Sequence, residues 1–303
     1  MLPRGIVPVL QTPFDDQGGL DETSLARLVE SAIVAGASGL LAPVVASEVA
    51  ALSCEERERI VRVVSDATQG RVPLIVGASA DEASRCAVQA GLAREVGAAA
   101  YLVAVPPGLY HEPHRIVPFF RDVVAGAGEL PLVIQDLEFG GPGLDLPTIE
   151  ELRRSLPTLV GLKIETVPAG PKYTAVREAF GDGFHVSGGW AVPQMIEALD
   201  RGVDAMMPEA SMIAVYVAIE RAHRGGDRVR ARRLFQSLLP VLAFANQEIA
   251  TSIAFFKRLL VRKGIFSTAR IRMAGFEWDR FNERIADELI EHYLALESEV
   301  RLA

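Results

Sequence analysis

The chain has 303 residues, of which 50% are hydrophobic and 23% charged, and its formal net charge is -8. This length and hydrophobic content can bury one large core or two medium ones, and they exclude a disordered chain. A nucleic-acid partner is not expected, because neutralising phosphates requires clustered Lys and Arg rather than an acidic balance.

Two features bear on the cellular compartment. Cys54 and Cys86 lie at no metal-ligand spacing, which indicates reduced thiols in the cytoplasm. The sequence starts without a basic region leading into an apolar run of signal length, and no stretch approaches roughly 18 uninterrupted apolar residues. We therefore expect a cytoplasmic protein without export or a membrane span.

Short apolar runs alternate along the chain with longer amphipathic stretches, a pattern typical of βαβ units around a parallel sheet. Strands are predicted over residues 5–10, 39–43, 73–76, 99–103, 130–135, 159–164, 185–187 and 205–207. Helices are predicted over residues 22–35, 54–67, 80–96, 113–125, 146–155, 171–180, 192–201 and 210–224. This order predicts an α/β fold, a (β/α)8 TIM barrel over residues 1–224.

A doubly wound open sheet is the alternative fold. That fold favours a glycine-rich phosphate turn after the first strand, whereas residues 11–15 contain no glycine. Beyond the barrel the strand pattern stops, and helices are predicted over residues 228–246, 248–263 and 277–300. They form a C-terminal helical extension, residues 225–303. Its apolar positions recur at helical spacing and need a surface to cover, either the barrel flank or a second subunit.

Lys163 closes an apolar strand in the run Gly161-Leu162-Lys163-Ile164-Glu165, and the chain has only four lysines. An ammonium in a buried parallel strand loses hydration worth several kcal/mol unless it is paired or deprotonated. Active sites of barrels form at the carboxyl ends of the strands, where an uncharged amine can attack a carbonyl. The alternative is a lysine just past the strand end whose ammonium reaches solvent.

Glu165 lies two residues beyond Lys163, so strand alternation points both side chains to the same side. A carboxylate beside the amine can shuttle protons during imine formation and remove a proton from the carbon next to the imine. The alternative is a plain ion pair that only holds the lysine in place.

Several motifs match one known family in order and spacing over nearly the whole chain. They are Thr12-Pro13-Phe14 with Asp21, Glu48 with Leu52-Ser53 and Glu55-Glu56-Arg57, Pro131-Leu132-Val133-Ile134, Gly161-Leu162-Lys163, Ser187-Gly188-Gly189, and Lys257-Arg258-Leu259-Leu260 with Gly264. On these residues the chain resembles the dihydrodipicolinate synthase and N-acetylneuraminate lyase family of Schiff-base aldolases and dehydratases. The resemblance implies that Lys163 is the Schiff-base nucleophile. It also implies a homo-oligomer, a tetramer or a dimer.

Departures from the family pattern limit the range of reactions that we expect for this chain. Members that handle pyruvate usually carry Gly-Thr-Thr-Gly-Glu where this chain reads Val44-Val45-Ala46-Ser47-Glu48. Substrate carboxylate binding is therefore expected from backbone N–H groups around Ala46, with the Ser47 hydroxyl. The family's relay tyrosine corresponds to Gln135, which cannot relay a proton as a phenol does. Residues 137–142 contain no arginine for a second carboxylate, so a true dihydrodipicolinate synthase is not expected.

The pair Lys163 and Glu165, with Gln135 in place of the tyrosine, resembles the subgroup of 2-keto-3-deoxy sugar-acid dehydratases. The implied reaction is attack by Lys163 on C2, deprotonation at C3 by Glu165, loss of the C4 hydroxyl, and hydrolysis. No metal or organic cofactor is expected, since the protonated imine is the electron sink. Retro-aldol cleavage to pyruvate and an aldehyde is the first alternative.

Two further alternatives remain open. One is a barrel that binds a 2-oxo acid without turnover, suggested by the missing threonines and tyrosine. The other is a phosphate-handling barrel, which is disfavoured because Met207-Pro208-Glu209 places an acid where an anion site is usual.

Other polar residues near strand ends are candidate substrate ligands. Asp136, Ser187 and Trp190 lie where they can read the hydroxyls of a polyol, although loop polarity or helix capping explains them equally well. Gly188, with the glycine after it, lets the backbone approach a substrate or simply makes a turn. Tyr110 is a candidate for the family's relay tyrosine at a subunit interface. The five histidines form no recognisable metal set.

Overall fold

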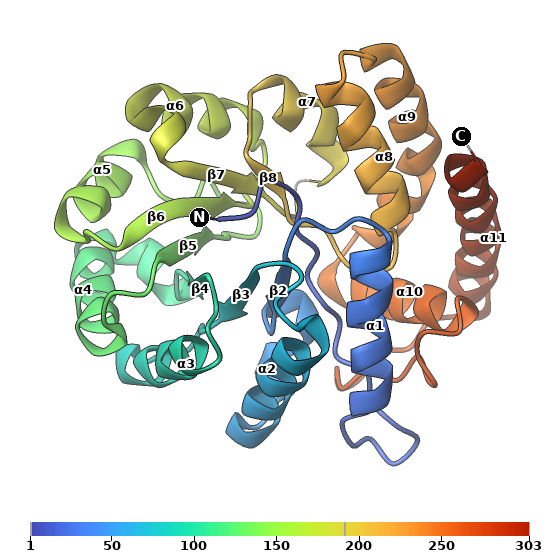
Figure 1. The fold of residues 1–303 in the computed structure, drawn as a ribbon, viewed down its shortest axis with the longest axis horizontal. Coiled ribbons are helices and arrows are strands. Elements are labelled where there is room, and N and C mark those ends of the chain that lie inside the picture. The colour runs from blue at the N-terminus through green and yellow to red at the C-terminus, as the bar shows by residue number, and fades with distance from the viewer. Residues whose placement is uncertain (1, 191, 303) are drawn as a thin grey trace.

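The computed structural model describes residues 2–190 and 192–302. Within them, eight parallel strands curl about a common axis, and helices surround them (Figure 1). The strands are β1 (Gly5–Ile6), β2 (Leu40–Ala42), β3 (Leu74–Gly77), β4 (Ala100–Ala104), β5 (Leu132–Asp136), β6 (Leu159–Ile164), β7 (His185–Gly188) and β8 (Ala205–Met206). Their order is β1-β8-β7-β6-β5-β4-β3-β2.

The ring closes between the segment after β1 and strand β2. Val9 forms a parallel bridge with Leu41, and the Leu10 N–H donates to the Leu41 carbonyl at 3.0 Å. The (β/α)8 barrel predicted from the sequence is thereby confirmed. The first strand is shorter than the predicted residues 5–10, since only isolated bridges continue it beyond Ile6.

Strand alternation divides the buried residues of the barrel into two sets. One set fills the barrel interior and includes Val7, Leu41, Ile75, Leu102 and Val133. The other set lies between the strands and the helices, and it forms a larger apolar cluster. Because strands buried on both faces need apolar residues at every position, they appear in the sequence as continuous apolar runs.

Within the described residues, eight helices surround the strands, and the side chain before three of them accepts from a free N–H group of the first turn. The eight helices are α1 (Glu22–Val34), α2 (Cys54–Thr68), α3 (Ala83–Glu95), α4 (Ile116–Ala127), α5 (Leu146–Ser155), α6 (Gly170–Phe180), α7 (Met195–Asp200) and α8 (Ile213–Arg224). Ser53 and Glu56 form a capping box at α2, and Asp21 and Asp145 cap α1 and α5. Helix α7 begins later than predicted, after a 3-10 turn at Val192–Gln194.

Three C-terminal helices follow, α9 (Arg228–Ala245), α10 (Ile249–Arg262) and α11 (Arg280–Leu302). Helix α9 packs on α8 and α10, and α11 packs on α8 and α9, so all three lie on one side of the barrel (Figure 1). Helix α10 also contacts the short turn η1 (Val45–Ser47) above β2. Buried residues of α9 and α10 join the cluster that surrounds the barrel. The division of the chain at residue 225 stays a prediction.

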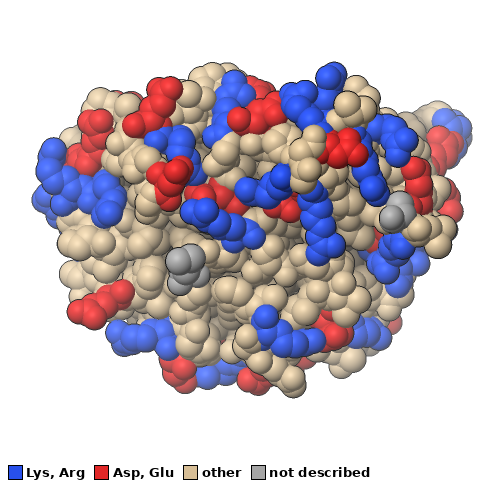
Figure 2. Space-filling view, turned by 45° about the horizontal axis from the view of Figure 1, so that its top comes forward, with Lys and Arg blue, Asp and Glu red and all other residues tan. Residues whose placement is uncertain are grey.

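The surface drawn in Figure 2 carries Lys and Arg side chains interspersed with Asp and Glu. Such a mixture forms no large field of one sign on that face. Within residues 2–190 and 192–302, no helix combines the length and the apolarity that crossing a membrane requires.

Candidate active site

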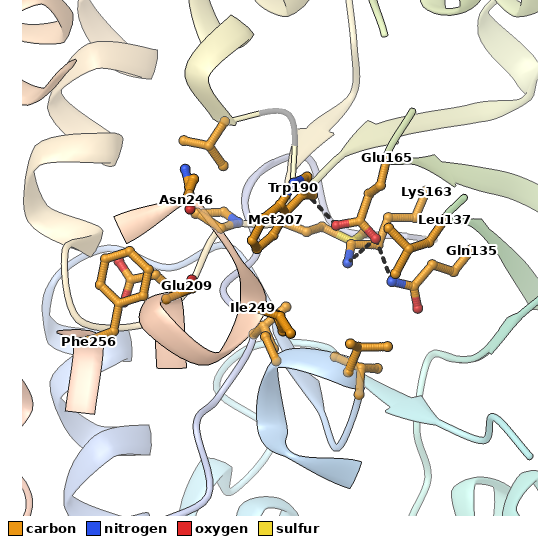
Figure 3. A pocket seen from close by; sticks show the side chains of 18 of the residues that line it. Gln135, Leu137, Lys163, Glu165, Trp190, Met207, Glu209, Asn246, Ile249 and Phe256 are labelled. Carbon is orange, nitrogen blue, oxygen red and sulfur yellow. Dashed lines mark hydrogen bonds and ion pairs between the residues drawn. The ribbon is translucent and has the colours of Figure 1, made fainter. Parts of the chain in front are cut away.

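A cavity lies at the carboxyl ends of the barrel strands, where β5, β6 and the segment after β8 end together (Figure 3). Gln135, Lys163 and Glu165 line it from the barrel side. The parallel register pairs Gln135 of β5 with Lys163 of β6, which places these two positions at the same height in the barrel. This is the edge at which barrel enzymes assemble catalytic groups.

Lys163 and Glu165 form a buried ion pair in this cavity. Their exposed fractions are 2% and 5%, and Lys163 Nζ donates to Glu165 Oε2 at 2.9 Å. The two side chains meet because residues two apart on a strand share one side. A proton can pass between the two groups at this distance without movement of either residue.

Glu165 is held by two further donors. Gln135 Nε2 donates to its Oε2, and the Trp190 backbone N–H donates to its Oε1 at 2.5 Å (Figure 3). The Gln135 Oε1 atom is buried without a hydrogen-bond partner among the described residues. A buried acceptor without a donor is costly, so this atom is a candidate contact for a bound molecule.

Gly189 allows the backbone to pass directly over the ion pair. A Cβ atom at this position would lie 2.6 Å from Lys163 Cε and 2.8 Å from Glu165 Cδ, which is closer than a side chain tolerates. Gly188, which the sequence suggested as a substrate-binding residue, faces the other way, toward Tyr173 and Met206. The two consecutive glycines at the end of β7 indicated in the sequence that the backbone comes close to the site. The second of them, Gly189, is the one that lines the cavity.

Ala46 and Trp190 line the cavity, as expected for substrate-binding residues, but Ser47 does not. The Ser47 hydroxyl donates to the Leu10 carbonyl at 2.6 Å and accepts from the Val44 N–H at 3.1 Å. It therefore connects the loop to the segment after β1, and its expected contact with a substrate carboxylate stays a prediction. The Trp190 ring packs edge-on against Phe139, with centroids 6.0 Å apart.

Asp136 also lies outside the cavity, because neighbouring residues on a strand point to opposite sides. Its fully buried carboxylate accepts from Tyr110 Oη and the Leu144 N–H, each at 3.0 Å, and it pairs with Lys172 at 2.8 Å. Tyr110 is thus a partner of Asp136 within the same chain. Contact of Asp136 with substrate hydroxyls, expected from the sequence, stays a prediction that this arrangement does not favour.

Ser187 of β7 is paired in register with Lys163 of β6, but it is not among the residues that line the cavity. Its hydroxyl donates to the Leu162 carbonyl at 3.2 Å and lies 3.7 Å from Met207 Sδ. Met207 lines the cavity. The expected contact of the Ser187 hydroxyl with a substrate stays a prediction.

The C-terminal helices supply lining residues that were not among the site residues expected from the sequence. They are Leu242 and Asn246 at the end of α9, and Ile249, Ser252 and Phe256 on α10. Glu209, just after β8, lines the same part of the cavity. Its carboxylate accepts from Gln11 Nε2 at 3.0 Å and from the Met212 N–H at 3.1 Å, and burial raises its pKa. The position of Glu209 directly after a barrel strand could have identified it as a site residue from the sequence. The residues on the C-terminal helices had no sequence feature that indicated a place in the cavity.

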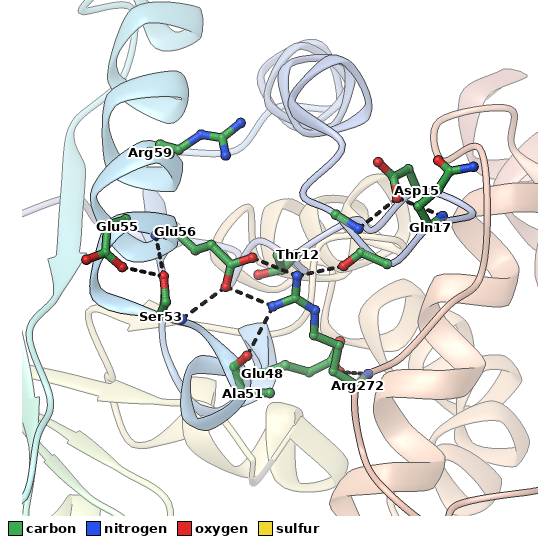
Figure 4. A network of polar contacts seen from close by, with 12 residues as sticks. Thr12, Asp15, Gln17, Glu48, Ala51, Ser53, Glu55, Glu56, Arg59 and Arg272 are labelled. Carbon is green, nitrogen blue, oxygen red and sulfur yellow. Dashed lines mark hydrogen bonds and ion pairs between the residues drawn. The ribbon is translucent and has the colours of Figure 1, made fainter.

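A second buried lysine–glutamate pair lies between the loop after β2 and helix α10. Lys257 donates to Glu48. Glu48 Oε2 also accepts from the Arg272 N–H at 2.6 Å, and Figure 4 shows these two residues side by side. Lys257 is fully buried, donates to the Arg270 carbonyl at 2.8 Å, and lies 4.3 Å from the centre of the Phe14 ring. Burial lowers the pKa of Lys257 to about 8. This pair ties the C-terminal segment to the loop that carries Ala46.

Comparison with known proteins is consistent with this geometry. Residues 2–276 match the Dihydrodipicolinate synthetase family. An L-2-keto-3-deoxyarabonate dehydratase from Azospirillum brasilense is 30% identical over 275 residues, which cover 89% of this chain and 87% of that protein. A 4-hydroxy-tetrahydrodipicolinate synthase from Methanopyrus kandleri is 29% identical, over 78% of this chain and 80% of that protein.

Solved structures share the fold at lower identity. Dihydrodipicolinate synthase from Rhodopseudomonas palustris superposes with a TM-score of 0.87 at 23% identity, covering 96% of this chain and 97% of that chain. The sialic acid aldolase of Ruminococcus gnavus gives a TM-score of 0.89 at 16% identity, covering 98% and 99% of the two chains. The match over residues 2–276 therefore places this chain in the dihydrodipicolinate synthetase family, as an enzyme of the lyase class.

Proposed function

We propose that this enzyme dehydrates a 2-keto-3-deoxy sugar acid through a Schiff base on Lys163. The observation that carries the proposal is the buried pair of Lys163 Nζ and Glu165 Oε2, 2.9 Å apart, at a cavity in the barrel mouth. The full-length similarity to an L-2-keto-3-deoxyarabonate dehydratase supports the choice of reaction.

The reaction begins when Lys163 Nζ attacks C2 and the ketone oxygen leaves as water. Glu165 then takes a proton from C3, and the iminium ion accepts the electron pair to form an enamine. The enamine expels the C4 hydroxyl, which leaves as water with the proton held by Glu165. Hydrolysis of the conjugated iminium ion frees Lys163 and the unsaturated 2-oxo acid, so the net change is the loss of one water.

The position of Glu165 favours deprotonation at C3. Its Oε2 is 2.9 Å from the nitrogen that becomes the imine, and C3 is only two bonds from that nitrogen. Gln135 and the Trp190 N–H hold the carboxylate in this place. The acceptor Gln135 Oε1, which has no partner among the described residues, can receive a hydroxyl of the substrate.

The substrate carboxylate is assigned to backbone donors of the loop after β2. Val45 and Ala46 line the cavity and are the first two residues of the 3-10 turn η1. The N–H groups at the start of such a turn have no acceptor within it, so they are free to bind an anion. The side chains of Val44 and Val45 cannot donate, which leaves the backbone to do so.

Product analysis tests the proposal. The enzyme is incubated with 2-keto-3-deoxypentonates and 2-keto-3-deoxyhexonates of each configuration, and the products are identified by NMR. We expect loss of one water from at least one of them, and no reaction with the Lys163→Ala variant. Formation of pyruvate and an aldehyde would replace dehydration with retro-aldol cleavage. Binding without turnover of any compound would contradict both reactions.

A further inference from the structure

The wall of the cavity opposite Lys163 comes partly from the C-terminal helices. It contains Asn246, which directly follows α9, and Ile249 and Phe256 of α10, together with Glu209 from the segment after β8. In Figure 3, Asn246, Glu209 and Phe256 lie across Met207 from Lys163, and Ile249 lies below Met207. A substrate whose C2 is bonded to Lys163 can direct its far end toward this wall, and Leu137 and Phe139, the other lining residues beyond Lys163, are also uncharged.

We propose that this far wall selects 2-oxo acids whose far end is uncharged, so that the substrates are 2-keto-3-deoxyaldonates and not the corresponding dicarboxylic acids. The inference rests on the proposed Schiff-base function, because Lys163 fixes which end of the substrate faces the wall.

The charges that line the cavity carry the argument. Among the described lining residues Lys163 is the only cation, and the reaction uses it as the nucleophile. Glu209 lies on the far wall, and the nearby Lys263 is already engaged by Glu297 at 2.9 Å and by the Ser211 carbonyl at 2.7 Å. A second carboxylate placed there would lose its hydration and find no cation among the described lining residues.

The uncharged groups of the wall suit a hydroxymethyl end instead. Asn246 and Ser252 supply an amide and a hydroxyl, and neither side chain is engaged in a hydrogen bond with the described residues. Leu242, Ile249 and Phe256 surround them with apolar surface. A few neutral polar groups in an apolar wall are typical of a site that orients a neutral ligand.

The test compares two substrates that differ only at the far end, a 2-keto-3-deoxyaldonate that the enzyme dehydrates and its counterpart with a terminal carboxylate. We expect kcat/KM to favour the aldonate by about 100-fold or more, because the dicarboxylate leaves a buried charge unpaired. Equal kcat/KM values for the two substrates would overturn the inference.

A charge introduced into the wall provides the matched variant. Ile249 is half-buried at the start of α10, so an arginine there can reach the cavity without filling the core. Ile249→Arg should reduce the preference for the aldonate at least about tenfold, while Ile249→Met, which adds length without charge, should leave it within about twofold. An unchanged preference in Ile249→Arg would contradict the inference.

Pyruvate separates this inference from the proposed function, because it has no far end. Treatment with pyruvate and borohydride should modify Lys163 in the unaltered enzyme and in both variants, which also shows that the variants fold. Absence of the adduct from the unaltered enzyme would overturn the Schiff-base function and this inference with it. An adduct together with equal rates for the two substrates would overturn the far-wall inference alone.

Discussion

Lys163 and Lys257 are both buried against a glutamate, at 2% and 0% exposure, yet their surroundings differ. Lys257 is enclosed by Glu48, a backbone carbonyl and the Phe14 ring, so its contacts are all made within the protein. Lys163 has one carboxylate partner and faces a cavity. The difference teaches that burial of a lysine does not by itself indicate catalysis, and that free space beside the amine is what distinguishes a nucleophile.

Replacing Lys163 or Lys257 with methionine should separate an effect on turnover from an effect on the free energy of unfolding. Lys163→Met should lower turnover about 10⁴-fold or more, because the covalent intermediate cannot form. Its free energy of unfolding should change little, since Glu165 keeps the Gln135 and Trp190 donors and borders a cavity that water can enter. Steady-state kinetics and urea unfolding measure the two quantities. Retained turnover would remove Lys163 from the mechanism.

Lys257→Met should show the opposite behaviour. Loss of the ammonium leaves the Glu48 carboxylate buried without its charge partner, so the free energy of unfolding should fall by about 3–5 kcal/mol. The double variant Lys257→Met with Glu48→Gln should recover part of this loss, because no buried charge is left behind. Urea unfolding of the three proteins provides the measurement, and equal stability of the single variant and the parent would show that the pair is not structural.

Glu165→Gln should sharpen the assignment within the catalytic pair. The amide cannot take the C3 proton, so kcat for dehydration should fall about 10²-fold or more. The adduct with pyruvate and borohydride should still form, because Lys163 remains. Loss of both activities would mean that Glu165 is required before the proton-abstraction step, and full activity would leave it with a structural role only.

The pH dependence of stability should carry a signature of Lys257. The folded-state pKa of about 8 lies below the ordinary value of 10.5, so the unfolded chain binds more protons between these values. The free energy of unfolding contributed by this group should therefore rise as the pH increases from about 8 to about 10.5. Urea midpoints of the parent and Lys257→Met, compared across this range, isolate the contribution. A difference that does not vary with pH would contradict the lowered pKa.

The barrel and the neighbouring positions of Lys163 and Glu165 were predictable because both follow from local periodicity. Continuous apolar runs marked the strands, and two-residue alternation placed the two side chains together. The same rule shows why Asp136, next to Gln135, points away from the cavity. Nearness to a strand end therefore does not by itself indicate that a side chain faces the cavity.

Other features of the site depend on contacts between segments far apart in the chain. The Ser47 hydroxyl donates to the Leu10 carbonyl, and the Ser187 hydroxyl lies 3.7 Å from Met207 Sδ. The far wall depends on α10 packing over the loop after β2, which no local pattern of residues 249–256 reveals. Such contacts follow from how the helices dock on the barrel, and a single sequence does not specify that docking.

Borohydride trapping with pyruvate tests the central claim most directly, because the chain has only four lysines and each can be assigned by peptide mapping. The account predicts one reduced pyruvyl group per chain, on Lys163, with Lys257 unmodified in its enclosed pair. Modification of Lys257, Lys172 or Lys263 in place of Lys163, or no modification at all, would contradict it.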